Sequence, residues 1–123
     1  MSTTLRALQD VLDEHSNLTI DGLVHPWETA APERRAALLA HASEFECAVA
    51  WLSLVPKRKA VSRGHGYSYT IKHVIQRWAG EYISNGATIA AALHLGFPVL
   101  QCPATINAWI GVEGRRKWPM GRR

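Results

Sequence analysis

The sequence predicts an α+β domain that is mostly helical, with about four helices followed by a C-terminal β-hairpin. Apolar residues recur at helical spacing through most of the chain, and glycines stand where helices would stop. After Gly96 the pattern changes to short runs of β-forming residues. Two short helices before a hairpin is also the element order of a winged helix–turn–helix protein. A length of 123 residues suits one domain of ordinary size.

The first half of the chain predicts two helices and a short strand. A helix is expected over about residues 4–15, after a run of good N-cap residue types, and a short strand over 18–20. The second helix should begin at Pro32, whose missing N–H is harmless in a first turn, and end before Pro56. Its apolar stripe advances by alternating steps of four and three, through Leu38, Ala42, Phe45, Val49 and Leu52.

Two shorter helices are expected in the second half. Ser68 can cap the third helix, and Gly80 can end it by adopting a left-handed conformation. Ser84 or Asn85 can cap the fourth helix, which Gly96 would end in the same way.

The chain after Gly96 predicts a hairpin and a basic arm. Two runs rich in β-forming residues, 97–102 and 106–112, are separated by three residues. Residues 114–123 are rich in arginine and lysine and are expected to form a basic C-terminal tail outside a domain of residues 1–113.

Charge is divided unevenly along the chain. Residues 1–56 hold three arginines against eight carboxylates, a formal charge of −5, whereas residues 57–123 hold eleven lysines and arginines against two carboxylates, or +9. Such asymmetry points to a polyanionic partner. Alternatively, the two halves neutralise each other within the fold or pair across a homodimer.

The composition also bears on compartment and cofactors. The N-terminal residues lack an apolar signal core, and no apolar run is long enough to span a membrane. Cys47 and Cys102 form no CxxC pair and no H-E-x-x-H motif occurs, so neither a metal nor another cofactor is expected. The cysteines are expected to be buried reduced thiols in a cytoplasmic protein with no membrane partner.

Cationic residues supply the main candidates for nucleic-acid binding. Lysine and arginine clusters bind phosphates with strong salt dependence. Tyr67, Tyr69 and Trp118 accompany the cations, as aromatics that stack on unpaired bases would. The alternative is a solvated loop and a frayed terminus. The expected phosphate contacts are Lys57, Arg58, Lys59, Arg63, Lys72, Arg77, Arg115, Arg116 and Lys117.

The helix expected over 85–95 would be the recognition helix of a winged helix–turn–helix fold. Asn85 can read adenine, and Thr88 can contact a thymine methyl group. The helix contains no arginine or lysine, however, so it cannot make the commonest specific contact, which is to guanine. The alternative is that this alanine-rich helix is buried.

A catalytic alternative rests on Tyr69, Lys72 and His73, which share one face of the third helix. A tyrosine tuned by a nearby lysine can perform acid–base chemistry. The spacing is common by chance, and no dinucleotide fingerprint, P-loop or nucleophile elbow accompanies it. A structural role is therefore favoured, and no catalysis is expected.

The second half also resembles a group of known sequences, through Ser68-Tyr69-Thr70-Ile71-Lys72-His73, Tyr82-Ile83-Ser84-Asn85-Gly86-Ala87-Thr88-Ile89-Ala90-Ala91-Ala92 and Leu95-Gly96-Phe97. This core, over about residues 57–112, is similar to short uncharacterised proteins carried by bacterial phages, plasmids and integrative elements. The resemblance carries over no functional residues. It implies either a small DNA-binding accessory or regulatory protein of a mobile element, or an inhibitor of a host defence system. An inhibitor of the anti-CRISPR kind would bind a protein or a protein–RNA complex.

Overall fold

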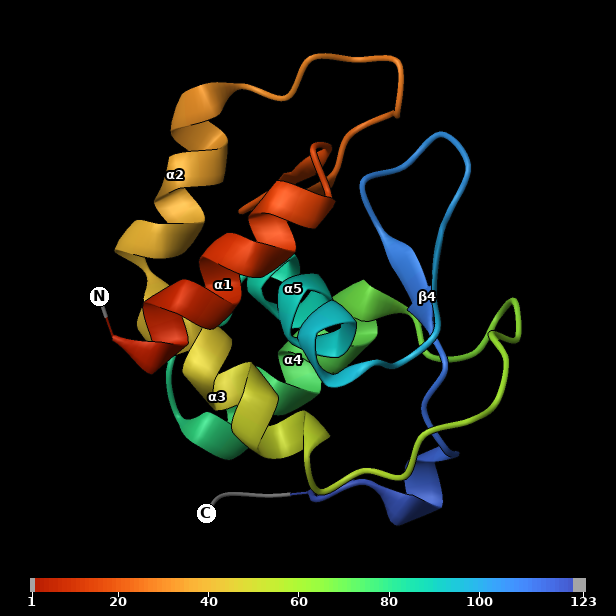
Figure 1. Ribbon diagram of the computed structural model, residues 1–123. Coiled ribbons are helices and arrows are strands. Elements are labelled where there is room, and N and C mark those ends of the chain that lie inside the picture. The colour runs from red at the N-terminus through yellow and green to blue at the C-terminus, as the bar shows by residue number, and fades with distance from the viewer. Residues whose placement is uncertain (1, 121–123) are drawn as a thin grey trace.

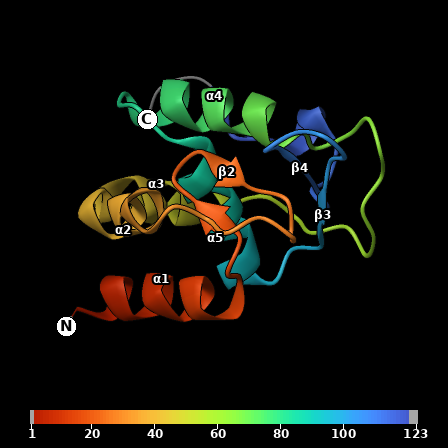
Figure 2. The ribbon, with the colours of Figure 1, turned by 90° about the horizontal axis from the view of Figure 1, so that it is seen from above.

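Helix α5 (Asn85–Leu95) lies at the centre of the fold. Figures 1 and 2 show it between α1 (Thr3–Glu14) and α4 (Ser68–Ala79). The computed structural model describes residues 2–120. Four alanines in α5 are buried, and their small side chains let α3 (Ala42–Leu52) approach closely.

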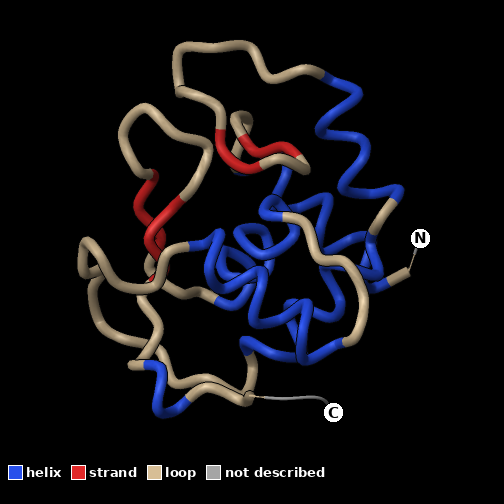
Figure 3. The backbone as a smooth tube through the Cα atoms, turned by 180° about the vertical axis from the view of Figure 1, so that it is seen from behind, coloured by secondary structure: helices blue, strands red, loops and turns tan. Residues whose placement is uncertain are grey.

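The α+β class is confirmed, with five α-helices and two β-hairpins in the described chain. The remaining elements are β1 (Leu18–Thr19), β2 (Gly22–Leu23), α2 (Pro32–Ala40), β3 (Val99–Gln101), β4 (Ala108–Ile110) and the 3-10 turn η1 (Arg115–Lys117). In Figure 3 the C-terminal hairpin and the loop before α4 lie to one side of the helices, whereas the first hairpin lies beside α2.

Local signals bound the helices of the second half, with one exception. The predicted Ser68 cap of α4 is wrong: the N-cap is Tyr67, and the Ser68 hydroxyl instead accepts from the Ala108 N–H at 3.0 Å. The Ser84 hydroxyl accepts a hydrogen bond from the Ala87 N–H at 3.1 Å, so Ser84 is the N-cap of α5. Gly80 ends α4 with φ of 77° and Gly96 ends α5 with φ of 83°, both in the left-handed region that favours glycine.

The single helix expected between Pro32 and Pro56 is wrong. The helix is interrupted at His41, whose φ of −116° and ψ of 41° are not helical, so α2 and α3 are separate helices. The break lets α2 pack on β1 and α1 while α3 packs along α5. The apolar stripe of the sequence continues across this interruption, so tertiary packing, rather than the local pattern, sets where the two helices end and begin.

The C-terminal hairpin forms as expected and packs on α4 and α5. Val99 pairs with Ile110, and Gln101 pairs with Ala108. The first hairpin pairs β1 with β2. The sequence predicted a short strand over 18–20 but not this hairpin, which crosses the N-terminal end of α5. Gly86 N–H donates to the Ile20 carbonyl at 2.9 Å there, in a contact too close for a side chain on Gly86.

None of the helices in the described range 2–120 is long and apolar enough to cross a membrane. Cys102 is buried, Cys47 is half-buried, and the two are not joined in a disulfide. Burial raises the pKa of the Cys102 thiol.

Candidate nucleic-acid interface

The loop before α4 and the turn η1 lie side by side, because backbone hydrogen bonds join the chain before and after them. Lys57 pairs with Val112 in an antiparallel bridge, and the Arg58 N–H donates to the Gly111 carbonyl at 2.7 Å. Glu113 N–H donates to the Pro56 carbonyl at 3.0 Å. Two basic segments that are more than fifty positions apart in the sequence therefore form one surface.

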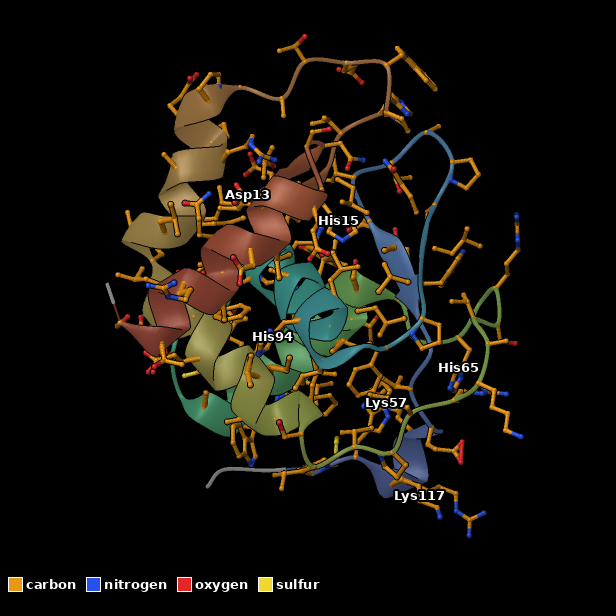
Figure 4. All side chains as sticks on the ribbon, viewed as in Figure 1. Asp13, His15, Lys57, His65, His94 and Lys117 are labelled. Atoms are coloured by element: carbon orange, nitrogen blue, oxygen red, sulfur yellow. The ribbon has the colours of Figure 1, made fainter. Side chains whose placement is uncertain are left out.

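We name this region the basic surface. Its members are Lys57, Arg58, Lys59, Arg63, Arg115, Arg116 and Lys117. Arg63 lies at its edge, near enough to Cys102 for its charge to act on that thiol. Six of the seven side chains are exposed, and Arg58 is half-buried. Figure 4 shows Lys57 and Lys117 at the same end of the molecule, away from Asp13 on α1. Glu113 is the one carboxylate within residues 57–63 and 113–117, which together hold the seven cations.

Carboxylates of the first half do not neutralise the basic surface. Within residues 2–120, Asp21 forms an ion pair with Arg34, and His25 and His41 lie within 4.0 Å of Glu28 and Glu44. All of these contacts lie before residue 57. Lys57 and Arg115 instead lie over aromatic rings, at 5.4 Å from the Phe97 centroid and 5.5 Å from the Trp118 centroid. The charges of the two segments thus remain available to a partner.

The expected C-terminal tail is wrong as far as residue 120. Trp118 is only 8% exposed and meets Trp51 edge to face, with ring centroids 5.6 Å apart. The Trp118 indole N–H donates to the Glu113 carbonyl at 2.7 Å, and the Trp51 indole N–H donates to the Pro119 carbonyl at 3.0 Å. These contacts fix η1 on the core, since an aromatic pair adds to the apolar area that it buries. Residues 121–123 of the expected tail lie outside the described range.

Helix α5 exposes no recognition face at its N-terminal end. Thr88 is 0% exposed, and its hydroxyl donates to the Ser84 carbonyl at 3.1 Å. Asn85 is 6% exposed, and its amide nitrogen donates to the carbonyls of Asp21 at 3.0 Å and Ile106 at 3.3 Å. The predicted base contacts of Asn85 and Thr88 are therefore wrong, because both side chains hold the fold together. The alternative of a buried helix is correct.

Two predicted phosphate contacts are not part of the basic surface. Lys72 is 4% exposed, so its predicted contact with a phosphate on the outer surface is wrong. Arg77 is exposed in the last turn of α4, about 14 Å along the helix from Ser68. In Figure 2 this end of α4 lies away from η1. Arg77 lies in the last turn of α4, where a cation interacts favourably with the helix dipole, so its position is explained without a phosphate contact.

Base stacking at the basic surface is not supported either. Tyr67 is half-buried against Trp109, with ring centroids 4.9 Å apart, and its hydroxyl accepts from the Asn107 amide at 2.8 Å. Trp118 is buried. Tyr69 is exposed, but it lies beside His73 and Lys72 on α4. Tyr67 and Trp118, two of the three aromatic residues predicted to stack on bases, therefore present no accessible ring face beside the cations of the basic surface.

The neighbours of Lys72 differ from the acid–base pair that the sequence suggested. The ammonium lies over the Tyr69 ring, 5.6 Å from its centroid, and over the Tyr82 ring at 4.3 Å. Burial lowers the pKa of Lys72, and the Glu44 carboxylate opposes this shift. The spacing of residues 69 and 72 indicated their proximity, but no local signal indicated Tyr82, which reaches Lys72 from the turn after α4.

Metal binding has no visible support within residues 2–120, where no three histidine, cysteine or carboxylate side chains are grouped as metal ligands would be. Comparison with known proteins finds no matching family model, no matching curated protein and no matching solved structure.

Proposed function

We propose that the protein binds nucleic acid through the basic surface, without catalysis, and that its main target is the phosphate backbone of duplex DNA. The observation that carries the proposal is that two basic segments lie together while the ion pairs of the described chain lie in its other half. A patch of unpaired cations releases condensed counterions when it meets a polyanion.

Duplex DNA is favoured over a single strand because of what surrounds the cations. Single-strand binders combine charge with exposed aromatic rings. Here Trp118 and Phe97 are buried, and each carries a cation on its ring. Phosphate contacts fix position without reading sequence, so we expect low sequence preference. The role that follows is an accessory protein of DNA, consistent with the mobile-element context that the sequence resemblance implies.

The salt dependence of binding tests this proposal. If all seven cations contact phosphates, the logarithm of affinity should fall against the logarithm of salt with a slope of about −6. Affinity should then drop by roughly 4,000-fold between about 50 and 200 mM salt, measured by fluorescence anisotropy with a labelled duplex.

A charge-matched pair of variants locates the interface. Lys57→Gln with Lys59→Gln removes two exposed cations from the basic surface and should reduce the slope by about 1.8. Arg6→Gln with Arg77→Gln removes two exposed cations elsewhere and should leave the slope nearly unchanged. An equal reduction in both double variants, or no measurable affinity for duplex at low salt, would refute the proposal.

A second candidate function, an inhibitor that binds a host defence protein or complex, is favoured by one observation. Trp27 is 79% exposed and stacks on His25, with ring centroids 4.4 Å apart and planes at 4°. Tryptophan is enriched among the residues that dominate protein interfaces. Trp27→Ala should abolish inhibition of a defence complex in a nuclease-treated assay, whereas the Lys57→Gln, Lys59→Gln variant should retain it.

A further inference from the structure

A small pocket of mixed polar and apolar lining lies at the start of β4, at the opposite end of that strand from the Lys57–Val112 bridge of the basic surface. Its volume is about 210 Å³, and it is enclosed by the N-terminal ends of α4 and α5, the turn of the first hairpin and the loop before β4. The side chains that matter are those of Tyr69, Lys72, Tyr82 and Asn85. Asn107 precedes β4 at the pocket, and Val112 follows β4 at the basic surface, about 16 Å further along an extended chain.

Lys72 brings to this pocket a buried ammonium without a hydrogen-bond acceptor, although the Glu44 carboxylate lies near enough to act on its charge. The side chain is 4% exposed, and it donates no hydrogen bond and forms no ion pair among residues 2–120. Its contacts with Tyr69 and Tyr82 are to ring faces, which attract a cation but accept none of its three N–H donors. An acceptor that entered the pocket would therefore lower the cost of burying this ammonium.

Asn85 brings an unsatisfied acceptor to the same pocket. Its amide nitrogen donates to two carbonyls, those of Asp21 and Ile106, so the orientation of the amide is fixed. The amide oxygen is buried and has no donor within the described chain. Asn107 also has a buried oxygen without a donor, but its single contact with a hydroxyl suits either amide orientation, so the argument rests on Asn85.

Lys72 and Asn85 line the same pocket, so a ligand that both accepts and donates hydrogen bonds would satisfy both groups. A bare oxyanion supplies acceptors only, so it would leave the Asn85 oxygen without a donor. An amine supplies donors only and would meet Lys72. A carbonyl next to an N–H satisfies both groups, and the exposed rings of Tyr69 and Tyr82 at the rim suit a flat partner.

We propose that this pocket binds a nucleobase, whose carbonyl accepts from Lys72 and whose adjacent ring N–H donates to Asn85. Uracil, thymine and guanine carry that pair of groups. The base could belong to a free nucleoside or to an unpaired nucleotide of a strand, since both present the same edge. The proposal does not depend on the basic surface, which shares none of these residues.

Calorimetric titration with uridine tests the proposal, with ribose and inorganic phosphate as separate probes. Uridine should bind at millimolar concentration or below, and ribose and phosphate should not. Lys72→Met keeps the apolar stem and removes the ammonium, so uridine affinity should fall by roughly tenfold or more, because a hydrogen bond from a charged donor is lost. Tyr82→Ala, at a 62% exposed position, should also weaken binding without disturbing the core.

The Lys57→Gln, Lys59→Gln variant is the control, because it should lose duplex affinity and keep uridine affinity. Titration with a short thymidine oligonucleotide then separates the two sources: Lys72-dependent binding of the oligonucleotide indicates an unpaired nucleotide, whereas binding of uridine alone indicates a free nucleoside. Absence of uridine binding, uridine binding that Lys72→Met leaves unchanged, or competition by inorganic phosphate would overturn the proposal. Failure of duplex binding alone would bear only on the basic surface.

Discussion

Replacing Gly86 with alanine should destabilise the protein, although the same change at an open helical position stabilises. Gly86 is in the first turn of α5, where alanine normally gains about 0.5–1 kcal/mol over glycine. A Cβ on Gly86 would overlap the Thr19 carbonyl oxygen and lie 2.6 Å from two atoms of Ile20. These neighbours are backbone atoms of the first hairpin, so they cannot move aside by changing a rotamer.

The magnitude follows from two costs. Overpacking of this kind costs about 1–3 kcal/mol. Moving the hairpin away also breaks the hydrogen bond from the Gly86 N–H to the Ile20 carbonyl, which contributes about 1 kcal/mol. After the gain in helix propensity is subtracted, the net loss in the free energy of unfolding should be about 1–3 kcal/mol.

Urea unfolding followed by circular dichroism measures this difference, provided that the slope of the unfolding free energy against urea is the same in both proteins. Gly114→Ala is the matched control, because its φ is −57° and a Cβ there meets nothing within 4 Å. It should change stability by less than about 0.5 kcal/mol. A Gly86→Ala protein as stable as the wild type would show that the first hairpin does not approach α5 as described.

Three further predictions concern single side chains. Trp118→Ala should lower the free energy of unfolding by about 3 kcal/mol and weaken duplex binding, since η1 loses its anchor on Trp51; urea unfolding and anisotropy measure the two effects. Asp21→Asn removes a half-exposed bidentate pair with Arg34 and should cost less than about 1 kcal/mol at neutral pH. Because the Arg34 guanidinium lowers the pKa of Asp21, the contribution is fully present above the ordinary carboxyl pKa, and the difference between variant and wild type should be lost as pH falls through the lowered pKa of Asp21. Lys72→Met should be more stable than wild type at neutral pH by up to about 1 kcal/mol. Because burial lowers the pKa of Lys72, the free energy of unfolding of the wild type should rise as pH rises toward the ordinary lysine pKa, so the difference between the two proteins should shrink.

Residues with local chemistry allowed much of the second half to be predicted. Ser84 caps the start of α5 with its hydroxyl, and Gly80 and Gly96 end α4 and α5 with a left-handed backbone. Each acts on residues close to it in the chain, so its effect is visible in the sequence. The break at His41 had no such signal, because no glycine or proline stands there and the apolar stripe continues. Its cause is the packing of α2 and α3 on different neighbours.

The basic surface was predictable in composition but not in arrangement. Charge counting identified the loop and the last segment, whereas their adjacency depends on the bridge between Lys57 and Val112. The burial of α5 did have a sequence signal, since residues 85–93 contain no charged side chain. Lys72 shows the opposite case, because a lysine is expected outside, and only the tertiary position of Tyr82 explains why it is covered.

The pairing of Trp51 with the segment around Trp118 also constrains synthesis of the chain. The Trp51 indole gains its hydrogen-bond acceptor only when residue 119, which is 68 positions later, has left the ribosome. Until then the end of α3 presents an uncovered tryptophan to chaperones and proteases. A product that terminates before residue 118 should therefore be degraded quickly in the cell, even though it contains all five α-helices.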